Sequence, residues 1–225
     1  MDTHIIITAG GFGKRFGSVI PKQFLEICGK PILVHTMEVF HRTIPNAGIT
    51  LVLPEMVMHI WDDICARHKL EIPHKVVRGG TTRFNSVKNG LDSIVEETLI
   101  GIHDGVRPLV SSETIIRCFE AADAHGAAIP VMPVHESLRI IDNKEASRPV
   151  DRNLYRLVQT PQCFKYDVIK SAYDTDYQES FTDDATIVEA AGYKIKLVEG
   201  NIENIKITTP SELQLAKALI DNGTQ

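Results

Sequence analysis

The sequence predicts an α/β fold with a mostly parallel, doubly wound sheet. Short β-branched runs alternate with longer amphipathic segments from His4 onward, and this rhythm is typical of βαβ units. Several of the runs are continuously apolar, which is the pattern of strands buried on both faces. Ligands of open α/β sheets bind beyond the carboxyl ends of the strands. The residues after Thr8, Val77 and His103 are therefore the first candidates for a functional site.

Strands and helices alternate regularly as far as residue 133. The first strand is an isoleucine run that stops at a glycine loop, Pro31 suits the first turn of a helix, and Ser111 suits a helix cap. The expected strands are His4–Thr8, Ile49–Leu53, Lys75–Val77, Leu99–His103 and Ala127–Pro133. The expected helices are Ile32–His41, Glu55–Lys69, Phe84–Val95 and Ser111–His125.

The alternation breaks after residue 133. Leu138–Asp142 and Val150–Val158 flank a polar segment, which predicts a β-hairpin arm over about residues 136–158 that stands off the body. The remaining expected strands are Gln162–Phe164, Lys194–Val198 and Ile205–Thr208, and the remaining helices are Val168–Tyr173, Asp183–Ala191 and Pro210–Asp221. The sequence contains no repeat and no linker, so we expect residues 1–225 to form one domain.

Composition excludes several classes of protein. The 225 residues include 24 Lys and Arg against 29 Asp and Glu, and a net charge of −5 argues against nucleic acid as a partner. No apolar run approaches the roughly 18 residues of a membrane span, and the first residues do not resemble a signal peptide. The four cysteines are widely spaced, which predicts free thiols. We expect a protein of the reducing cytoplasm that does not enter membranes.

The loop after the first strand has the composition of a phosphate-binding loop. Three glycines and two cations occur in Ala9–Arg15. Glycines let backbone N–H groups approach phosphate oxygens, and cations neutralise them. The loop matches neither the Walker A nor the dinucleotide pattern. Lys22 could return a third cation to the same phosphates. A tight turn with solvated cations, and a surface position for Lys22, are the alternatives.

Two further motifs follow strand ends. In residues 78–86 the glycines would let the backbone hydrogen-bond a flat base edge, and Ser86 adds a hydroxyl; a helix-capping turn is the alternative. Asp104 could hold a magnesium ion that bridges phosphates, and Arg107 suits phosphate capture, unless the two simply pair across a turn. We interpret His103 as structural.

Lys206 lies inside an otherwise β-branched run. A buried ammonium needs an anionic partner, which a bound phosphate would provide. Exposure on an edge strand is the alternative.

In this order, the motifs resemble the family of 2-C-methyl-D-erythritol 4-phosphate cytidylyltransferases from Ile5 to about Leu215. The stretches that carry the resemblance are Ala9–Arg15, Pro21–Gln23, Gly79–Gly80 with Arg83 and Ser86–Val87, His103–Asp104 with Arg107–Pro108, Val150–Asn153, Thr160–Gln162, Thr182–Asp183, Glu199–Gly200 and Asn204–Lys206. The resemblance implies a Rossmann-like nucleotide-binding sheet, CMP transfer from CTP to a polyol phosphate with Mg²⁺, and a homodimer joined through the arm.

The resemblance also implies three sets of site residues. The nucleotide would be bound by Ala9, Gly10, Gly11, Phe12, Gly13, Gly80, Thr81, Ser86, Asp104 and Gly105. Transition-state stabilisation would come from Arg15 and Lys22, and the metal site from Asp104. The acceptor would be held by Arg107, Ser137, Arg152, Thr160, Thr182 and Lys206, with Arg152 and Lys206 aiming it for catalysis. Arg107, Ser137 and Arg152 would complete the site of the neighbouring subunit.

Three alternatives remain at this stage. Gly105-Val106 replaces the two alanines usual in the family, Ser137 replaces a threonine, and the chain is also similar to ribitol-5-phosphate cytidylyltransferases. Asp174-Thr175-Asp176 spells the D-x-D metal motif of glycosyltransferases, although it follows a helix rather than a central strand. A non-catalytic nucleotide sensor is the third alternative.

Overall fold

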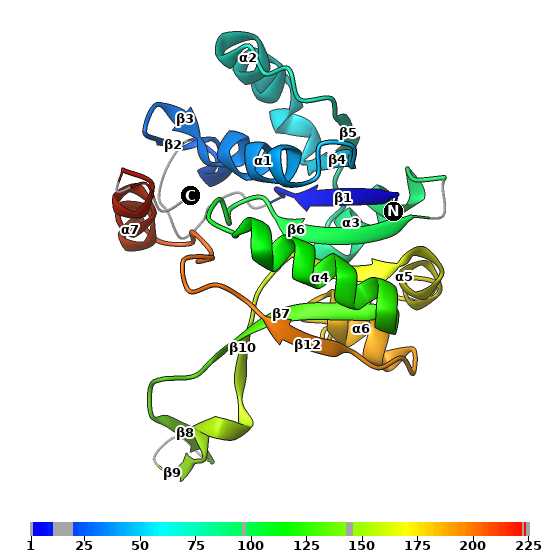
Figure 1. Cartoon of the computed structure of the whole chain (residues 1–225), viewed down its shortest axis with the longest axis vertical. Helices are drawn as coiled ribbons and strands as arrows, with labels where there is room; N and C mark the ends of the chain where they lie inside the picture. The colour runs from blue at the N-terminus through cyan, green and yellow to red at the C-terminus, as the bar shows by residue number, and fades with distance from the viewer. Residues whose placement is uncertain (1, 11–19, 96–97, 143–145, 222, 224–225) are drawn as a thin grey trace.

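A central sheet of eight strands organises the molecule. The computed structural model describes residues 2–10, 20–95, 98–142, 146–221 and 223. The strands of the central sheet are β1 (Thr3–Thr8), β4 (Gly48–Leu53), β5 (Lys75–Arg78), β6 (Leu99–Asp104), β7 (Ala127–Pro133), β10 (Arg156–Val158), β11 (Gln162–Lys165) and β12 (Lys196–Glu199). Their order is β10-β7-β11-β6-β1-β4-β5, with β12 paired to β7 (Figure 1).

The sheet is mostly parallel, as predicted. β1 pairs in parallel with β4 and β6, β4 with β5, and β12 with β7. β11 is antiparallel to both β6 and β7, and β10 is antiparallel to β7. The antiparallel strands are those that bring the chain back to the sheet after the arm.

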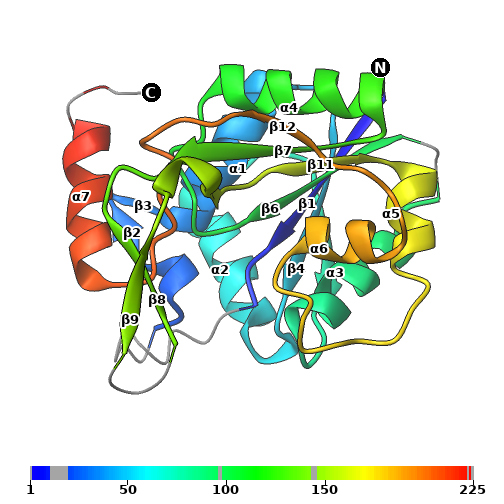
Figure 2. The same ribbon diagram turned by 90° about the horizontal axis from the view of Figure 1, so that it is seen from below.

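Helices cover both faces of the sheet, which is the doubly wound arrangement. One face carries α1 (Ile32–Thr43), α2 (Met58–His68) and α4 (Ser112–His125), and the other carries α3 (Arg83–Asp92), α5 (Tyr166–Ala172) and α6 (Asp184–Ala190). Figure 2 shows α4 above the sheet and α3 and α6 below it. The last helix, α7 (Pro210–Asp221), packs beside a small hairpin of β2 (Glu26–Ile27) and β3 (Lys30–Pro31), which the sequence did not predict.

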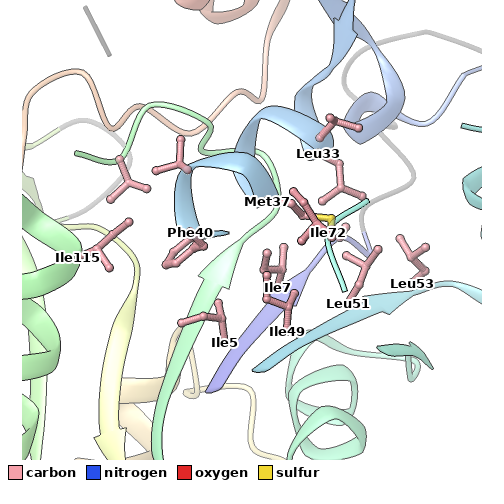
Figure 3. Packing of buried hydrophobic residues seen from close by; sticks show 14 of the residues in the cluster. Ile5, Ile7, Leu33, Met37, Phe40, Ile49, Leu51, Leu53, Ile72 and Ile115 are labelled. Carbon is pink, nitrogen blue, oxygen red and sulfur yellow. The ribbon is translucent and has the colours of Figure 1, made fainter. Parts of the chain in front are cut away.

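Successive residues of β1 pack alternately into two hydrophobic cores, one on each face of the sheet. Ile5 and Ile7 pack with Phe40 on the side of α1, whereas Ile6 packs with Val52 and Phe84 on the side of α3. Figure 3 shows the first cluster, where Ile5, Ile7 and Phe40 converge. The isoleucines are completely buried, and each contributes about 1.5–3 kcal/mol by leaving water. The interpretation of a strand buried on both faces is confirmed.

The arm is a separate two-stranded hairpin. β8 (Leu138–Ile141) pairs with β9 (Ser147–Val150), and the hairpin projects from the body below β7 (Figure 1). The single flank predicted at Val150–Val158 is wrong, because a 3-10 turn (Arg152–Leu154) separates β9 from β10. β10 then joins β7 in the central sheet, since its backbone finds a strand partner there.

Two more predicted elements differ from the structure. Glu55–Lys69 begins as a 3-10 turn (Glu55–Val57) before α2. The strand predicted at Ile205–Thr208 is wrong: Ile207 N–H donates to the Val106 carbonyl (2.9 Å), and the segment joins no ladder among the described strands. Burial of Ile207 against Val106 and α7 holds this segment instead. No described helix is both long and apolar enough to cross a membrane.

Candidate active site

A pocket of about 230 Å³ opens where β1, β5 and β6 reach their carboxyl ends. It is lined by Thr8, Ala9, Gly10, Lys22, Gln23, Gly80, Thr81, Thr82, Arg83, Ser86, Asp104, Val106 and Lys206. Eight of the predicted site residues therefore meet here: Ala9, Gly10, Lys22, Gly80, Thr81, Ser86, Asp104 and Lys206. The predicted residues Gly11, Phe12, Gly13 and Arg15 lie outside the described residues.

One side of the pocket, the charged half, is built around the Asp104 carboxylate. Asp104 Oδ2 lies 3.0 Å from both Arg107 Nε and Lys206 Nζ, and its Oδ1 lies 3.9 Å from Arg83 Nε. Burial by itself would raise the pKa of Asp104, but the charges of Lys206, Arg83 and Arg107 lower that pKa well below its usual range. The carboxylate is therefore ionised at neutral pH and holds three cations beside the pocket.

Lys206 differs from its prediction. Its side chain is partly exposed, with 42% of its surface accessible, and its ammonium pairs with Asp104. Ile207 N–H donates to the carbonyl of Val106, which lies in a loop, and the neighbouring Lys206 lines the pocket.

Arg83 is a site residue that the sequence analysis did not select. Its guanidinium donates two hydrogen bonds to Asp184, at 2.8 and 2.6 Å, and Asp184 is completely buried at the start of α6. Tyr173 Oη donates a third hydrogen bond to Asp184 (2.6 Å). A bidentate pair of this kind fixes the orientation of the arginine. No local motif reveals it, since 101 residues separate the two partners.

The other side, the backbone half, consists of Ala9, Gly10, Gly80 and Ser86. The Ser86 hydroxyl donates to the Thr82 carbonyl (2.9 Å) and accepts from Gly80 N–H (3.1 Å), so it closes the turn that precedes α3. A Cβ on Gly80 would come within 2.3 Å of Asn85 Cβ. Thr82 caps α3 by accepting from Asn85 N–H. This half offers shape and backbone groups rather than charge.

A short 3-10 turn (Lys22–Phe24) brings Lys22 to the rim of the pocket. Phe24 anchors the turn in the core, stacked on Trp61 with ring centroids 6.1 Å apart. Gln23 is buried, and its Nε2 donates to the Ala9 carbonyl (2.8 Å). Sequence reasoning included Gln23 only as part of a motif and gave it no role.

The other predicted site residues do not line the pocket in a single chain. Gly105 directly follows β6, and Thr160 Oγ1 accepts a hydrogen bond from Asp104 N–H (3.2 Å) at the end of that strand. Arg107 does not line the pocket but pairs with Asp104. Ser137 and Arg152 are exposed on the arm, where Arg152 Nη1 donates to the His135 carbonyl, and Thr182 is exposed just before α6.

His103 is structural, as interpreted. Its ring is completely buried, with Nδ1 against Thr160 Oγ1 (3.0 Å), Nε2 against the Arg107 carbonyl (3.1 Å) and its edge against Phe40. Burial is the main cause that lowers the pKa of His103, to about 4. The neutral ring therefore supports the strand end beneath Asp104.

The D-x-D alternative has no support. Asp174 follows α5 and lines a different hollow, with Lys88, Asp92 and Lys170. Neither Asp174 nor Asp176 is among the residues that line the pocket at the strand ends.

The comparisons with known proteins agree with this geometry. Residues 3–222 match the family model for 2-C-methyl-D-erythritol 4-phosphate cytidylyltransferase. The chain is 49% identical to the enzyme of that name from Phocaeicola vulgatus over 98% of this chain and 100% of the relative, and 51% identical to that from Bacteroides fragilis over 96% and 98%.

Solved structures match the whole fold as well. The cytidylyltransferase from Thermus thermophilus superposes with a TM-score of 0.77 and 32% identity, covering 98% of this chain and 100% of the other. The 4-diphosphocytidyl-2C-methyl-D-erythritol synthase from Anaerococcus prevotii superposes with a TM-score of 0.83 and 29% identity, covering 98% and 96%. With sequence, fold and pocket in agreement, the chain belongs to the family of 2-C-methyl-D-erythritol 4-phosphate cytidylyltransferases.

Proposed function

We propose that this chain transfers CMP from CTP to 2-C-methyl-D-erythritol 4-phosphate and releases pyrophosphate. The observation that carries the proposal is the meeting of two unlike halves in one pocket, a backbone turn suited to a nucleotide and a carboxylate that holds three cations. The names of the relatives support methylerythritol phosphate, rather than ribitol phosphate, as the acceptor.

The reaction requires positioning and charge rather than a protein nucleophile. The acceptor phosphate is itself ionised at neutral pH, so its oxygen attacks the α-phosphorus of CTP in line while pyrophosphate leaves. Lys22 at the pocket rim, together with Arg15, neutralises the charge on the phosphate oxygens. Lys206 aims the acceptor phosphate, and Arg83 and Arg107 hold the carboxylate that orients Lys206.

We also propose that Asp104 serves a magnesium site. Asp104 is ionised, and among the described residues its Oδ1 makes only the longer 3.9 Å contact with Arg83, which leaves an oxygen suited to Mg²⁺. No group of three or more acidic, histidine or cysteine side chains gathers for a metal in the described part of the chain. Phosphate oxygens and water would complete the coordination, which is usual for this ion. When bound, the ion neutralises phosphate charge.

We propose a homodimer joined through the arm. Ile141, Leu154 and Leu157 are exposed on or next to the arm, with 69%, 81% and 58% of their surface accessible. The predicted acceptor residues Ser137 and Arg152 stand on the same arm, outside the pocket of their own chain. A partner's arm would bring these residues to the site and cover the apolar side chains.

We propose a reducing, cytoplasmic setting because the cysteines are free thiols. The four cysteines are free, and Cys118 and Cys163 are buried. Free thiols are typical of proteins from reducing compartments.

Pyrophosphate release tests the reaction. With CTP and Mg²⁺, we expect turnover with methylerythritol 4-phosphate and none with ribitol 5-phosphate; turnover with ribitol 5-phosphate alone would overturn the assigned acceptor. Mixing Arg152→Ala and Lys206→Ala chains tests the dimer. If the arm completes the partner's site, mixed dimers regain one intact site and activity returns. An equally inactive mixture that sedimentation shows to contain mixed dimers would contradict the crossing arm.

A further inference from the structure

Gln23 carries a hydrogen-bonding atom that has no partner among the described residues. The residue is 1% exposed and lines the pocket. Its Oε1 is buried and has no hydrogen-bond partner in the described part of the chain. Buried polar atoms are nearly always paired, because an unpaired one retains the cost of leaving water. Because Gln23 lines the pocket, a molecule bound there can supply the missing donor.

The orientation of the amide is fixed by its other end. Nε2 of Gln23 lies 2.8 Å from the Ala9 carbonyl, which can only accept a hydrogen bond. The nitrogen must therefore face Ala9, and the atom left over must be the oxygen. Ala9 is itself fixed, because its N–H donates to the Val52 carbonyl (3.0 Å). Gln23 thus ties the Lys22 turn to the first residue of the glycine loop.

The position of Gln23 selects the nucleotide as the occupant. Ala9 and Gly10 adjoin the turn before α3, since a Cβ on Gly10 would lie 3.8 Å from Ser86 Oγ. Gln23, which is hydrogen-bonded to Ala9, therefore adjoins the backbone half of the pocket. The triphosphate of CTP offers only acceptors, so within CTP only the nucleoside can supply a donor to Oε1. The nucleoside donors are the cytosine amine and the ribose 2′- and 3′-hydroxyls.

We propose that Gln23 is a nucleotide-binding residue whose Oε1 accepts a hydrogen bond from the nucleoside part of CTP, while its Nε2 holds the Ala9 carbonyl in place. The inference rests on the proposed use of CTP and adds a residue to it. Because the same side chain adjoins Lys22, the contact would couple seating of the nucleoside to the placement of that lysine.

Binding of nucleotide analogues tests the contact. The dissociation constants of CTP, 2′-deoxy-CTP, 3′-deoxy-CTP and UTP, each with Mg²⁺ and without acceptor, are measured by calorimetry for the wild type, Gln23→Met and Gln23→Glu. We expect one analogue to bind the wild type at least about fivefold more weakly than CTP, the size of one hydrogen bond of about 1 kcal/mol. Gln23→Met, whose thioether is only a weak acceptor, should bind that analogue and CTP about equally.

Gln23→Glu separates the ligand contact from the structural one. It keeps an acceptor oxygen and loses the donor to Ala9, so its overall affinity falls but its preference for CTP over the same analogue remains. Gln178→Met, on an exposed loop, is the matched control and should behave as the wild type. The proposal would be overturned if the ratio of analogue affinity to CTP affinity were the same in the wild type, Gln23→Met and Gln23→Glu. Failure of the wild type to bind CTP at all would instead overturn the proposed function.

Discussion

The two halves of the pocket are assembled in opposite ways. The charged half gathers Asp104, Arg107, Lys206 and Arg83 from distant parts of the chain, and charge holds it together. The backbone half uses short contacts near β1 and α3, in which Ser86 closes its own turn through neutral hydrogen bonds. Changes in the charged half should therefore act on several groups at once, whereas changes in the backbone half should act locally.

The largest effect is expected from Asp104→Asn. Three cations would lose their common counter-ion, and the proposed metal site would lose its carboxylate. We expect kcat/KM to fall by about 10³, equivalent to about 4 kcal/mol, in a pyrophosphate-release assay. Acidification to pH 5 would not reproduce the effect, because the pKa of Asp104 lies well below its usual range. Asp174→Asn is the control; a loss below tenfold in Asp104→Asn would contradict the central role of this carboxylate.

The contribution of His103, which supports the strand end beneath Asp104, to the stability of the fold should be sensitive to acid. The folded-state pKa of His103 is lowered from 6.5 to about 4, so the unfolded chain binds more protons between these values. Its contribution to stability is present above pH 6.5 and is lost as the pH falls toward 4, by about 3 kcal/mol at most. Denaturant unfolding from pH 7 to 4 should show a shallower loss in His103→Gln than in wild type. Exposed His59→Gln should retain the wild-type slope, and equal slopes in all three would refute the assignment.

Lys206→Met tests whether the two halves bind different substrates. We expect KM for the acceptor to rise about 30-fold, equivalent to about 2 kcal/mol, with KM for CTP unchanged. Lys196→Met, on the exposed edge of β12, is the matched control. A parallel rise in both KM values would show that the halves are not separable.

Lys22→Ala probes the junction between the halves. We expect kcat to fall at least about tenfold, or about 1.4 kcal/mol, because Lys22 acts on charge in the transition state. The melting temperature should change little, because the contacts of Phe24 and Gln23 that anchor the turn remain. Exposed Lys194→Ala is the comparison, and an unchanged kcat in Lys22→Ala would remove Lys22 from the transition state.

The smallest effect is expected from Ser86→Ala in the backbone half. Loss of the hydroxyl leaves Gly80 N–H and the Thr82 carbonyl without this partner, but it alters only one turn. We expect KM for CTP to rise about fivefold, or about 1 kcal/mol, while KM for the acceptor stays constant. Exposed Ser171→Ala should leave both constants unchanged. A larger change in acceptor KM would contradict the local character of this half.

Local sequence pattern predicts the residues at the strand ends, in both halves of the pocket, better than it predicts Arg83. The apolar runs of β1 and β6 end at residues that the chain itself marks, Ala9-Gly10 and Asp104, so the strand ends and the pocket between them could be predicted. The Arg83–Asp184 pair joins residues 101 positions apart, and nothing near Arg83 indicates its partner.

Prediction also failed where tertiary contacts outweigh local propensity. Ile205–Thr208 has the composition of a strand, but burial of Ile207 beside Val106 places it in a loop. The antiparallel orientation of β11 was not predicted, because an apolar run does not indicate whether the strand is parallel or antiparallel to its neighbours. Likewise, the sequence does not indicate that Gln23 Oε1 lacks a hydrogen-bond partner among the described residues, because this depends on its surroundings in the fold.

The antiparallel strand β11 has a consequence for the order in which the molecule can be completed during synthesis. β6 and β7 are not neighbours in the sheet, because β11 lies between them. A nascent chain that ends at Pro133 would present β6 with an open edge, since the segment that fills the gap is still to be made. Open strand edges can pair with the wrong strand. The growing chain therefore needs protection while residues 134–161 are being synthesised.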